Sequence, residues 1–468
     1  MAENSARKIP SFAAVCTLAE SHRPGFGVGE AARRLRRIAY VKQRLVHLAA
    51  AHLNAAPEWE VKSALALHAW LDAEHASTLR QRVLELRETP ARLAERPNPA
   101  LAAALDEVAE SGSSLELLTA VYAVLRPALL EAMETYLAET NPLADHPSCR
   151  ALKIVAREEA EIIGWGRAAL EALTDSPAAR ARSEEWAAHV SAYLAAAGRI
   201  ARRDVPPAKK SLPRRRAQAL RPPGFPPARD ARFAGLFDTS TPADTVYLDD
   251  SRPAAERNLA LMFKRLREMD VPEVVAGIVA QTPDKPWEYY AEMSRQMWDE
   301  ARHALLGEAA LSRRQPAGEV DWTRLPVNVT FSWKLAKYCT PLERHILLYA
   351  IEQSLMPARR GKRYEWELAR AAGDALMDTF QDFDWADEVL HVAIARRQLK
   401  SSLRGGLSEA RRRSDRLWRR ITRQLEKHPM PDDAPTPNWW ASFVEQALGS
   451  RPAPVAETHV KDWRPLSA

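Results

Sequence analysis

Cysteine is scarce in this sequence, and its scarcity excludes two kinds of site. Cys16, Cys149 and Cys339 are the only cysteines among 468 residues, and they lie far apart without a C-x-x-C pair. Neither a disulfide framework nor a thiolate zinc site has this pattern. We therefore expect a protein of a reducing compartment, with the cytoplasm as the simplest location.

Long apolar runs are missing as well. The N-terminal stretch "MAENSARKIPSFAAVCTLAE" lacks a sustained apolar segment. No later window holds the roughly 18 uncharged apolar residues in succession that a bilayer-spanning helix needs. Neither secretion nor a membrane location is expected.

Glycine is sparse, with 17 residues, and alternating β-branched segments are nearly absent. Apolar residues instead recur three and four positions apart in Ala-, Leu-, Glu- and Arg-rich runs, which is the period of amphipathic helices. We expect an all-α protein with two helical sets, each containing the four long helices of a four-helix bundle. The expected helices cover 28–54, 58–88, 114–140, 148–173 and 181–199, then 252–269, 286–313, 341–356, 363–405 and 407–427.

Positive charge is concentrated in one segment. The formal charge of the chain is +6, yet residues 201–232 carry ten Lys or Arg against two Asp, so the remainder is near −2. Seven of the 33 prolines lie in the same segment, which excludes a regular helix. We interpret it as an extended linker between domains, with docking on RNA or another acidic partner as the alternative.

The two helical sets are similar to each other in sequence. "PEWEVKSALALHAWLDAEHA" at 57–76 aligns without gaps on "KPWEYYAEMSRQMWDEARHA" at 285–304, an offset of 228. Residues 121–128 match 348–355 at an offset of 227, and 158–161 match 388–391 at 230. We predict a tandem duplication with a first domain at 27–200, a basic proline-rich linker at 201–245, a second domain at 246–405 and a C-terminal helical extension at 406–468.

The second set carries a paired motif of the metal-ligand type. Glu300 and His303 are spaced i, i+3 and share one helix face, and Glu388 and His391 repeat that spacing. One further acid lies in apolar surroundings on each of the remaining long helices, and a count along antiparallel helices places Glu256 at the depth of Glu300. Four carboxylates and two imidazoles inside a bundle suit two iron or manganese ions. The predicted ligands are Glu256, Glu300, His303, Glu352, Glu388 and His391.

This ligand order resembles the ferritin-like di-iron carboxylate superfamily over residues 246–405, and in degenerate form over 27–200. The sequences "DEARH" at 299–303 and "DEVLH" at 387–391 resemble the motif pair of bacterial multicomponent monooxygenase hydroxylases and are similar to the ribonucleotide reductase small subunit. The chain is thus expected to form two tandem ferritin-like four-helix bundles.

The resemblance assigns a role to the acids that precede the ligands. Asp299 and Asp387 are expected to hold a ligand imidazole through its other nitrogen, with Arg302 linking the two acids. The alternative is that both are exposed acids beside a buried one.

The resemblance implies an O2-activating di-iron oxygenase or oxidase that acts on a small organic substrate. Its cofactor would be two iron ions, with manganese or a mixed pair as the alternative, and an electron-donor reductase and a homodimer are further expectations. Rival functions are a ferroxidase or iron-binding protein, a tRNA-modifying hydroxylase that uses the basic linker, and a non-enzymatic scaffold. Nucleic acid is otherwise not an expected partner.

One position separates this chain from the radical-storing members of the superfamily. The family's tyrosine would lie one turn after His303, where this chain has Gly307. A glycine there is expected to open space for an apolar substrate pocket, with ordinary core packing as the alternative. The expected lining is Met293, Met297, Gly307, Tyr349 and Met356.

The first set departs from the ligand pattern. Leu125 stands where the second set has Glu352, and Glu161 replaces His391. We expect a structural or regulatory pseudo-copy, with a mononuclear metal site as the alternative. The residues of this vestigial site are Glu30, Asp72, His75, Glu158 and Glu161.

Overall fold

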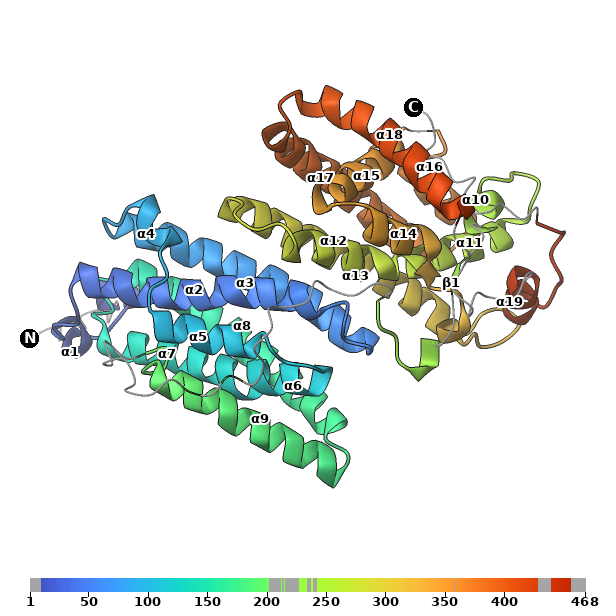
Figure 1. Ribbon diagram of the computed structural model, residues 1–468. Helices are drawn as coiled ribbons and strands as arrows, with labels where there is room; N and C mark the ends of the chain where they lie inside the picture. The colour runs from blue at the N-terminus through green and yellow to red at the C-terminus, as the bar shows by residue number, and fades with distance from the viewer. Residues whose placement is uncertain are drawn as a thin grey trace, which may run out of the picture. The chain divides into compact units, whose positions relative to one another are not determined.

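The computed structural model describes residues 10–201, 212, 214, 227–233, 237–238, 242–357, 359–427 and 439–455 (Figure 1). Helices dominate these residues. The strands among them are two residues each, β1 (Phe237–Asp238) pairing in parallel with β2 (Asn328–Val329). The predicted all-α class is confirmed. Most of the expected linker at 201–245 lies outside the described residues.

The chain divides into two compact units. Unit 1 comprises residues 1–48 and 71–220, and unit 2 comprises residues 49–70 and 221–468. Residues 49–70, which were expected in the first domain, therefore belong with unit 2. The expected C-terminal extension also belongs with unit 2, where its first helix packs on helices that carry predicted ligands.

The helices of unit 1 follow the predicted pattern, with added short segments. Residues 49–52 of α2 and 59–70 of α3 lie in unit 2. The bounds are η1 (Ser11–Ala14), α1 (Leu18–Ser21), α2 (Val28–His52), α3 (Trp59–Glu85), α4 (Pro90–Ala94), α5 (Pro99–Val108), α6 (Ser114–Leu118), the π-helical η2 (Thr119–Leu125), α7 (Arg126–Glu139), α8 (His146–Leu173) and α9 (Pro177–Ala196).

The helices of unit 2 are more broken than predicted. Their bounds are η3 (Ala231–Phe233), α10 (Pro242–Tyr247), α11 (Ala254–Arg267), η4 (Glu268–Asp270), α12 (Val271–Ala280), α13 (Trp287–Ser312), η5 (Trp322–Arg324), α14 (Thr330–Tyr338), α15 (Pro341–Ser354), α16 (Lys362–Ala371), α17 (Ala375–Ser402), α18 (Gly406–Lys427) and α19 (Trp439–Leu448).

Two local signals explain where these helices differ from the expected ones. The helix expected at 252–269 continues to Ala280 through the 3-10 turn η4, because Pro272 lacks an N–H and crowds the carbonyl four residues earlier, that of Glu268. The helix expected at 363–405 is divided by Gly373, which has a φ of 72°. Asp374 then caps α17 by accepting a hydrogen bond from the backbone N–H of Met377.

Gly307 sets the distance between α11 and α13. A Cβ atom at this position would lie 2.1 Å from the backbone nitrogen of Leu266 and 2.7 Å from the carbonyl carbon of Arg265. The expected open space beside Gly307 is therefore absent among the described residues, because the α11 backbone fills it. The glycine instead allows the two helices to pack closely at the level of the predicted ligands.

Within the described part of the chain, no helix combines the length and the apolarity needed to span a bilayer.

Candidate metal centre

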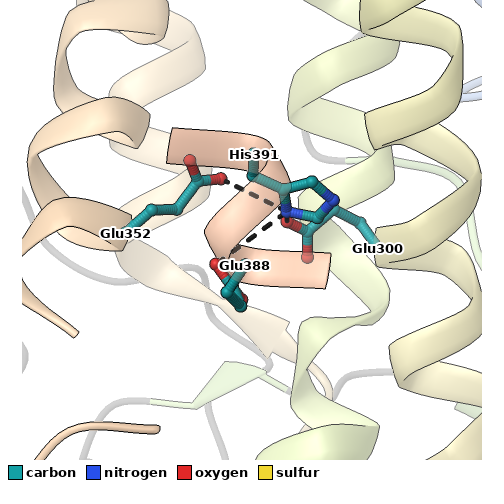
Figure 2. Close-up of side chains that lie close together, drawn as sticks. All are labelled: Glu300, Glu352, Glu388 and His391. Carbon is teal, nitrogen blue, oxygen red and sulfur yellow. Dashed lines mark ion pairs between the residues drawn. The ribbon is translucent and has the colours of Figure 1, made fainter. Parts of the chain in front are cut away.

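Three helices of unit 2 bring four predicted ligands to one buried point. Glu300 comes from α13, Glu352 from α15, and Glu388 and His391 from α17 (Figure 2). One ligand atom of each lies within 4.8 Å of the others, and all four residues are buried. The Nδ1 atom of His391 is 3.2 Å from Glu300 and 3.9 Å from both Glu352 and Glu388.

A second group of ligand atoms lies beside the first. Glu268, His303 and Asp384 place one ligand atom each within 4.8 Å of one another. His303 Nδ1 is 3.5 Å from Glu268 and 3.6 Å from Glu300 of the first group, and its ring centroid is 5.9 Å from that of His391. We call the combined set the unit 2 centre, which consists of Glu268, Glu300, His303, Glu352, Asp384, Glu388 and His391.

Glu256 does not belong to this centre. It lies in the first turn of α11, where it pairs with Arg252 at 2.7 Å and accepts a hydrogen bond from Trp440 Nε1 at 3.3 Å. Twelve residues separate it from Glu268, which is roughly 18 Å along a helix. The structure therefore places Glu268, in η4, where Glu256 was expected.

Glu256 was predicted as a ligand because the helix that carries it was expected to end near residue 269. In the structure the helical path runs on to Ala280. Counted from Ala280, Glu268 lies twelve residues before the end, and Glu300 lies thirteen residues after the start of α13 at Trp287. The same antiparallel rule with the observed end selects Glu268.

The acids that precede the ligands contact the imidazoles crosswise. His303 Nε2 donates to Asp387 at 3.2 Å, and His391 Nε2 donates to Asp299 at 3.4 Å, so each aspartate serves the histidine of the other helix. Arg302 donates to both aspartates at 2.7 Å. Since a carboxylate only accepts, these contacts keep the Nε2 atoms protonated and direct both Nδ1 atoms toward the centre.

The electrostatics of the centre favour an added cation. Burial lowers the pKa of His303, but the hydrogen bond with Asp387 and the nearby carboxylates of Glu268 and Glu300 outweigh burial and raise it to about 10. Burial and the neighbouring charge of Glu388 raise the pKa of Glu352 well above its usual range. Both shifts show carboxylates crowded together in a medium that solvates them poorly.

Two buried cations in the centre were missed by the sequence analysis. Lys362 Nζ lies 3.0 Å from the carboxylate of Asp384 and 2.9 Å from Glu388. Arg265 pairs with Asp384 and, at 2.8 Å, with Glu268. Asp384 precedes Glu388 by four residues and so shares its helix face, which is a signal the sequence does contain. No periodic pattern marks the two cations as metal-site neighbours.

Gln296 was also missed. This buried residue of α13 lies one turn before Glu300, and its Nε2 donates to Glu352 Oε1 at 2.6 Å. It therefore orients the carboxylate that α15 supplies. A buried amide one turn from a predicted ligand is the sequence signal that would have identified it.

The donor set fits metal ions on two observations. First, five carboxylates against two cations leave three negative charges in the centre when both histidines are neutral. Second, five ligand atoms are buried without a hydrogen-bond partner among the described residues, and buried polar atoms rarely remain so. These atoms are Glu268 Oε2, His303 Nδ1, Glu352 Oε2, Glu388 Oε2 and His391 Nδ1.

The expected pocket residues lie in different surroundings. Met293 and Met297 are fully buried core residues of α13, and Gly307 lies against α11. Tyr349 lines a groove on the surface of unit 2, whereas Met356, which follows α15, is partly exposed and does not line that groove. The substrate pocket expected at these five positions stays a prediction.

Unit 1 has a buried centre of a different kind. Lys42 of α2 donates to Asp72 of α3 at 2.7 Å and also to Glu159 of α8. Arg126 of α7 donates to Asp72 at 2.7 Å and to Glu159 at 3.1 Å. Two acids and two cations cancel in charge, and we call these four residues the unit 1 centre.

The pKa of His75, which was expected in a vestigial site, reflects this charge balance. His75 Nε2 lies 2.6 Å from Glu158, as His303 lies beside Asp387 in unit 2. This correspondence gives an offset of 229 for the last helix, not the expected 230. Burial, and then the charge of Lys42, lower the pKa of His75 to about 3. The unit 1 centre therefore repels a proton that the unit 2 centre attracts.

Two other residues of the expected vestigial site lie elsewhere. Glu30 pairs with Arg33 and Arg34 on its own helix, and Glu161 is exposed and 3.4 Å from Arg157. Glu159, which was not predicted, supplies the inward carboxylate of α8. The unit 1 centre thus retains Asp72 from the expected set and has His75 beside it.

Comparisons of this chain with protein-family models, with curated proteins and with solved structures gave no match.

Proposed function

We propose that unit 2 is a ferritin-like four-helix bundle that holds two iron or manganese ions and uses them, with O2, to oxidise an organic substrate. The observation that supports this most directly is the set of five unpartnered ligand atoms in a buried centre with excess negative charge. Oxygen-rich ligands with one imidazole for each ion suit iron and manganese better than zinc or copper. When bound, such ions would supply electrons to O2.

The residues would divide the work as follows. Glu268 and His303 would hold one ion, and Glu352 and His391 the other. Glu300, which lies 3.6 Å from His303 and 3.2 Å from His391, and Glu388, which lies 3.9 Å from His391, would supply further carboxylate ligands. Asp299 and Asp387 would hold the two imidazoles in the ligating tautomer. The buried surroundings would keep bulk water away from the reacting oxygen.

Tandem architecture is part of the proposal. Unit 1 would be the second ferritin-like bundle, in which Lys42 and Arg126 replace the function of the metals by neutralising the remaining acids. It would therefore serve as a structural pseudo-copy without a metal.

Ferroxidase activity is the second candidate. It needs the metal centre alone, and Gly307, which was expected to open space for an organic substrate, instead lies against the α11 backbone. The tRNA-modifying alternative depends on the basic linker, most of which lies outside the described residues.

Metal analysis tests the proposal. The purified protein loaded with Fe(II) under anaerobic conditions should contain about two iron ions per chain, and Glu300→Ala with His391→Ala should remove both. Glu367→Ala, an exposed acid of α16 paired with Arg363, is the matched control and should retain them. Mixing the diferrous protein with O2 should produce a rapid optical change. A parent chain that binds no iron or manganese would overturn the proposal.

Product analysis separates the two candidates. An oxygenase should couple O2 uptake to the loss of an organic substrate when a compound library is supplied with a reductant. Consumption of Fe(II) and O2 alone, with ferric ion as the product, would support the ferroxidase.

A further inference from the structure

A basic groove lies on the surface of unit 2. It encloses about 2000 Å³ between α15, the second half of α17 and α18. Six arginines line it, and Asp415 is the one acid in its described lining. The arginines are Arg396, Arg411, Arg412, Arg416, Arg419 and Arg423.

Helix α18 directs its arginines by its periodicity. Ala410, Ser414, Leu417 and Ile421 are buried and recur at helical spacing, so they form the inner face. The groove arginines of α18 extend from Arg411 to Arg423, twelve residues or roughly 18 Å along the helix axis. The guanidinium groups thus follow an extended line and do not converge on a single point.

The groove arginines differ from others of the same helix in their partners. Arg413 pairs with Glu409, and Arg420 pairs with Glu343 at 2.9 Å. None of the six groove arginines forms an ion pair with an acid of the described chain, and those of α18 donate at most to backbone carbonyls. Uncompensated guanidinium groups gathered in one concave surface indicate an anionic ligand.

The chemistry of the lining favours phosphate in a polymer. Guanidinium groups bind phosphate oxygens through paired hydrogen bonds. Hydroxyl groups such as those of Ser408 and Thr422 can also donate hydrogen bonds to the phosphates of a nucleic acid. The groove is larger than the roughly 300–1000 Å³ of a typical small-molecule site. Tyr349 and Trp418 contribute aromatic side chains to its lining, and the Trp418 ring also packs against Phe331, with ring centroids 5.1 Å apart; unpaired bases stack on aromatic rings of this kind.

We propose that this groove binds single-stranded nucleic acid, with phosphates along the arginine line and bases toward the aromatic side chains. The carboxylates of an acidic protein would pair with the arginines but would leave the aromatic lining unused. The inference does not depend on the metal centre, since the groove residues include none of its ligands.

Binding of labelled oligonucleotides tests the proposal. Fluorescence anisotropy with a 12-nucleotide single-stranded RNA and its DNA equivalent would be measured over a range of salt concentrations. The triple variant Arg416→Ser, Arg419→Ser, Arg423→Ser should weaken binding at least tenfold. It should also reduce the slope of log K against log salt by about 2, since each lost phosphate contact contributes roughly 0.7.

The matched control removes the same charge elsewhere on unit 2. Arg324, Arg363 and Arg397 are exposed, and each already pairs with an acid. Their triple change to Ser should alter affinity less than twofold. Circular dichroism would verify that both triple variants fold, as expected because Arg416, Arg419 and Arg423 are exposed.

Three outcomes would overturn the proposal. The first is that the parent chain binds neither oligonucleotide at low salt. The second is that both triple variants weaken binding equally. The third is that polyglutamate competes as well as the oligonucleotide at equal ionic strength. The last result would assign the groove to an acidic protein. Each outcome is independent of the iron content of the sample.

Discussion

Each aspartate beside the unit 2 centre serves the histidine of the opposite motif. Asp299 lies on α13 but contacts His391 of α17, and Asp387 of α17 contacts His303 of α13. Arg302 donates to both aspartates, and Arg295 donates to Asp299 at 2.7 Å. These contacts tie the two helices together at the level of the ligands, so ligand orientation does not depend on either helix alone.

Replacing Glu268 with Ala is expected to lower the metal content, whereas replacing Glu256 with Ala is not. Glu268→Ala removes a carboxylate that faces His303 at 3.5 Å, whereas Glu256→Ala removes a partner of Arg252 and Trp440. The first variant should lower iron content from about two toward one ion per chain, as measured by elemental analysis. The second should leave it unchanged. Equal loss in both variants would contradict the assignment of Glu268.

Much of the unit 2 centre could be predicted from residue spacing. The i, i+3 pairs on α13 and α17 place a carboxylate and an imidazole on one face whatever the helix ends are. Glu268 could not be found in this way, because its level along the bundle depends on where the helix ends. Pro272 is a residue that commonly marks a helix end in sequence, although the helical path continues through it. Lys362 could not be found either, since a lone lysine near a helix start carries no periodic signal.

Helix packing depends on Gly307. A methyl group added there would meet the α11 backbone, and backbone cannot move aside as a flexible side chain does. Gly307→Ala should therefore destabilise unit 2 by about 1–3 kcal/mol, a typical cost of overpacking. Urea denaturation followed by tryptophan fluorescence would measure it. Gly318→Ala, where the nearest atom lies 3.9 Å away, is the control and should change stability little. A Gly307→Ala protein as stable as the parent would show that α11 can move away.

The stability of the fold is expected to depend on pH through His345 of α15. Burial, and then the charge of Lys285, lower the pKa of this histidine to about 4, against about 6.5 in the unfolded chain. Below pH 6.5 the unfolded chain therefore gains a proton that the folded chain refuses. Its contribution to stability is fully present above pH 6.5 and is lost as pH falls toward 4, by up to about 3 kcal/mol.

His345→Gln tests this dependence. The substitution removes the titrating group, so the urea midpoint of the variant should fall less than that of the parent between pH 7 and pH 4.5. Parallel curves for the two proteins would show that His345 does not carry the effect.

Helix identity could be predicted, but helix continuity could not. The apolar period along α13 and α17 is strong enough to give their existence, both ends of α13 and the C-terminal end of α17. A proline at the start of a helix and a proline within a kinked path are the same residue in sequence, which is why the helix was expected to end at residue 269 and α12 was not predicted. Gly373 is also ambiguous, because glycine in a helix is tolerated unless its φ becomes positive.

Across the whole molecule, the two centres differ in how their buried carboxylates are neutralised. A buried carboxylate needs a positive partner, and in unit 1 that partner is supplied by Lys42 and Arg126. In unit 2 the carboxylates outnumber the buried cations, so the remaining negative charge requires a proton or a metal ion. The two similar stretches of sequence thus form similar helices but different centres, because a few inward residues make one centre neutral and leave the other with excess negative charge.

This difference predicts opposite effects of removing one buried acid from each centre. Asp72→Asn would leave Lys42 and Arg126 short of a partner, and breaking a buried ion pair typically costs about 3–5 kcal/mol. Glu352→Gln, studied in the metal-free protein after chelation, would remove a carboxylate whose pKa is already raised by burial and by Glu388, so unit 2 should become more stable. Hydrogen exchange of α8 and α17 peptides would report the two units separately. Iron content should be unchanged in Asp72→Asn and reduced in Glu352→Gln. If Asp72→Asn lost iron, or if Glu352→Gln destabilised the metal-free protein, the contrast between a self-neutralised centre and a metal-dependent one would be wrong.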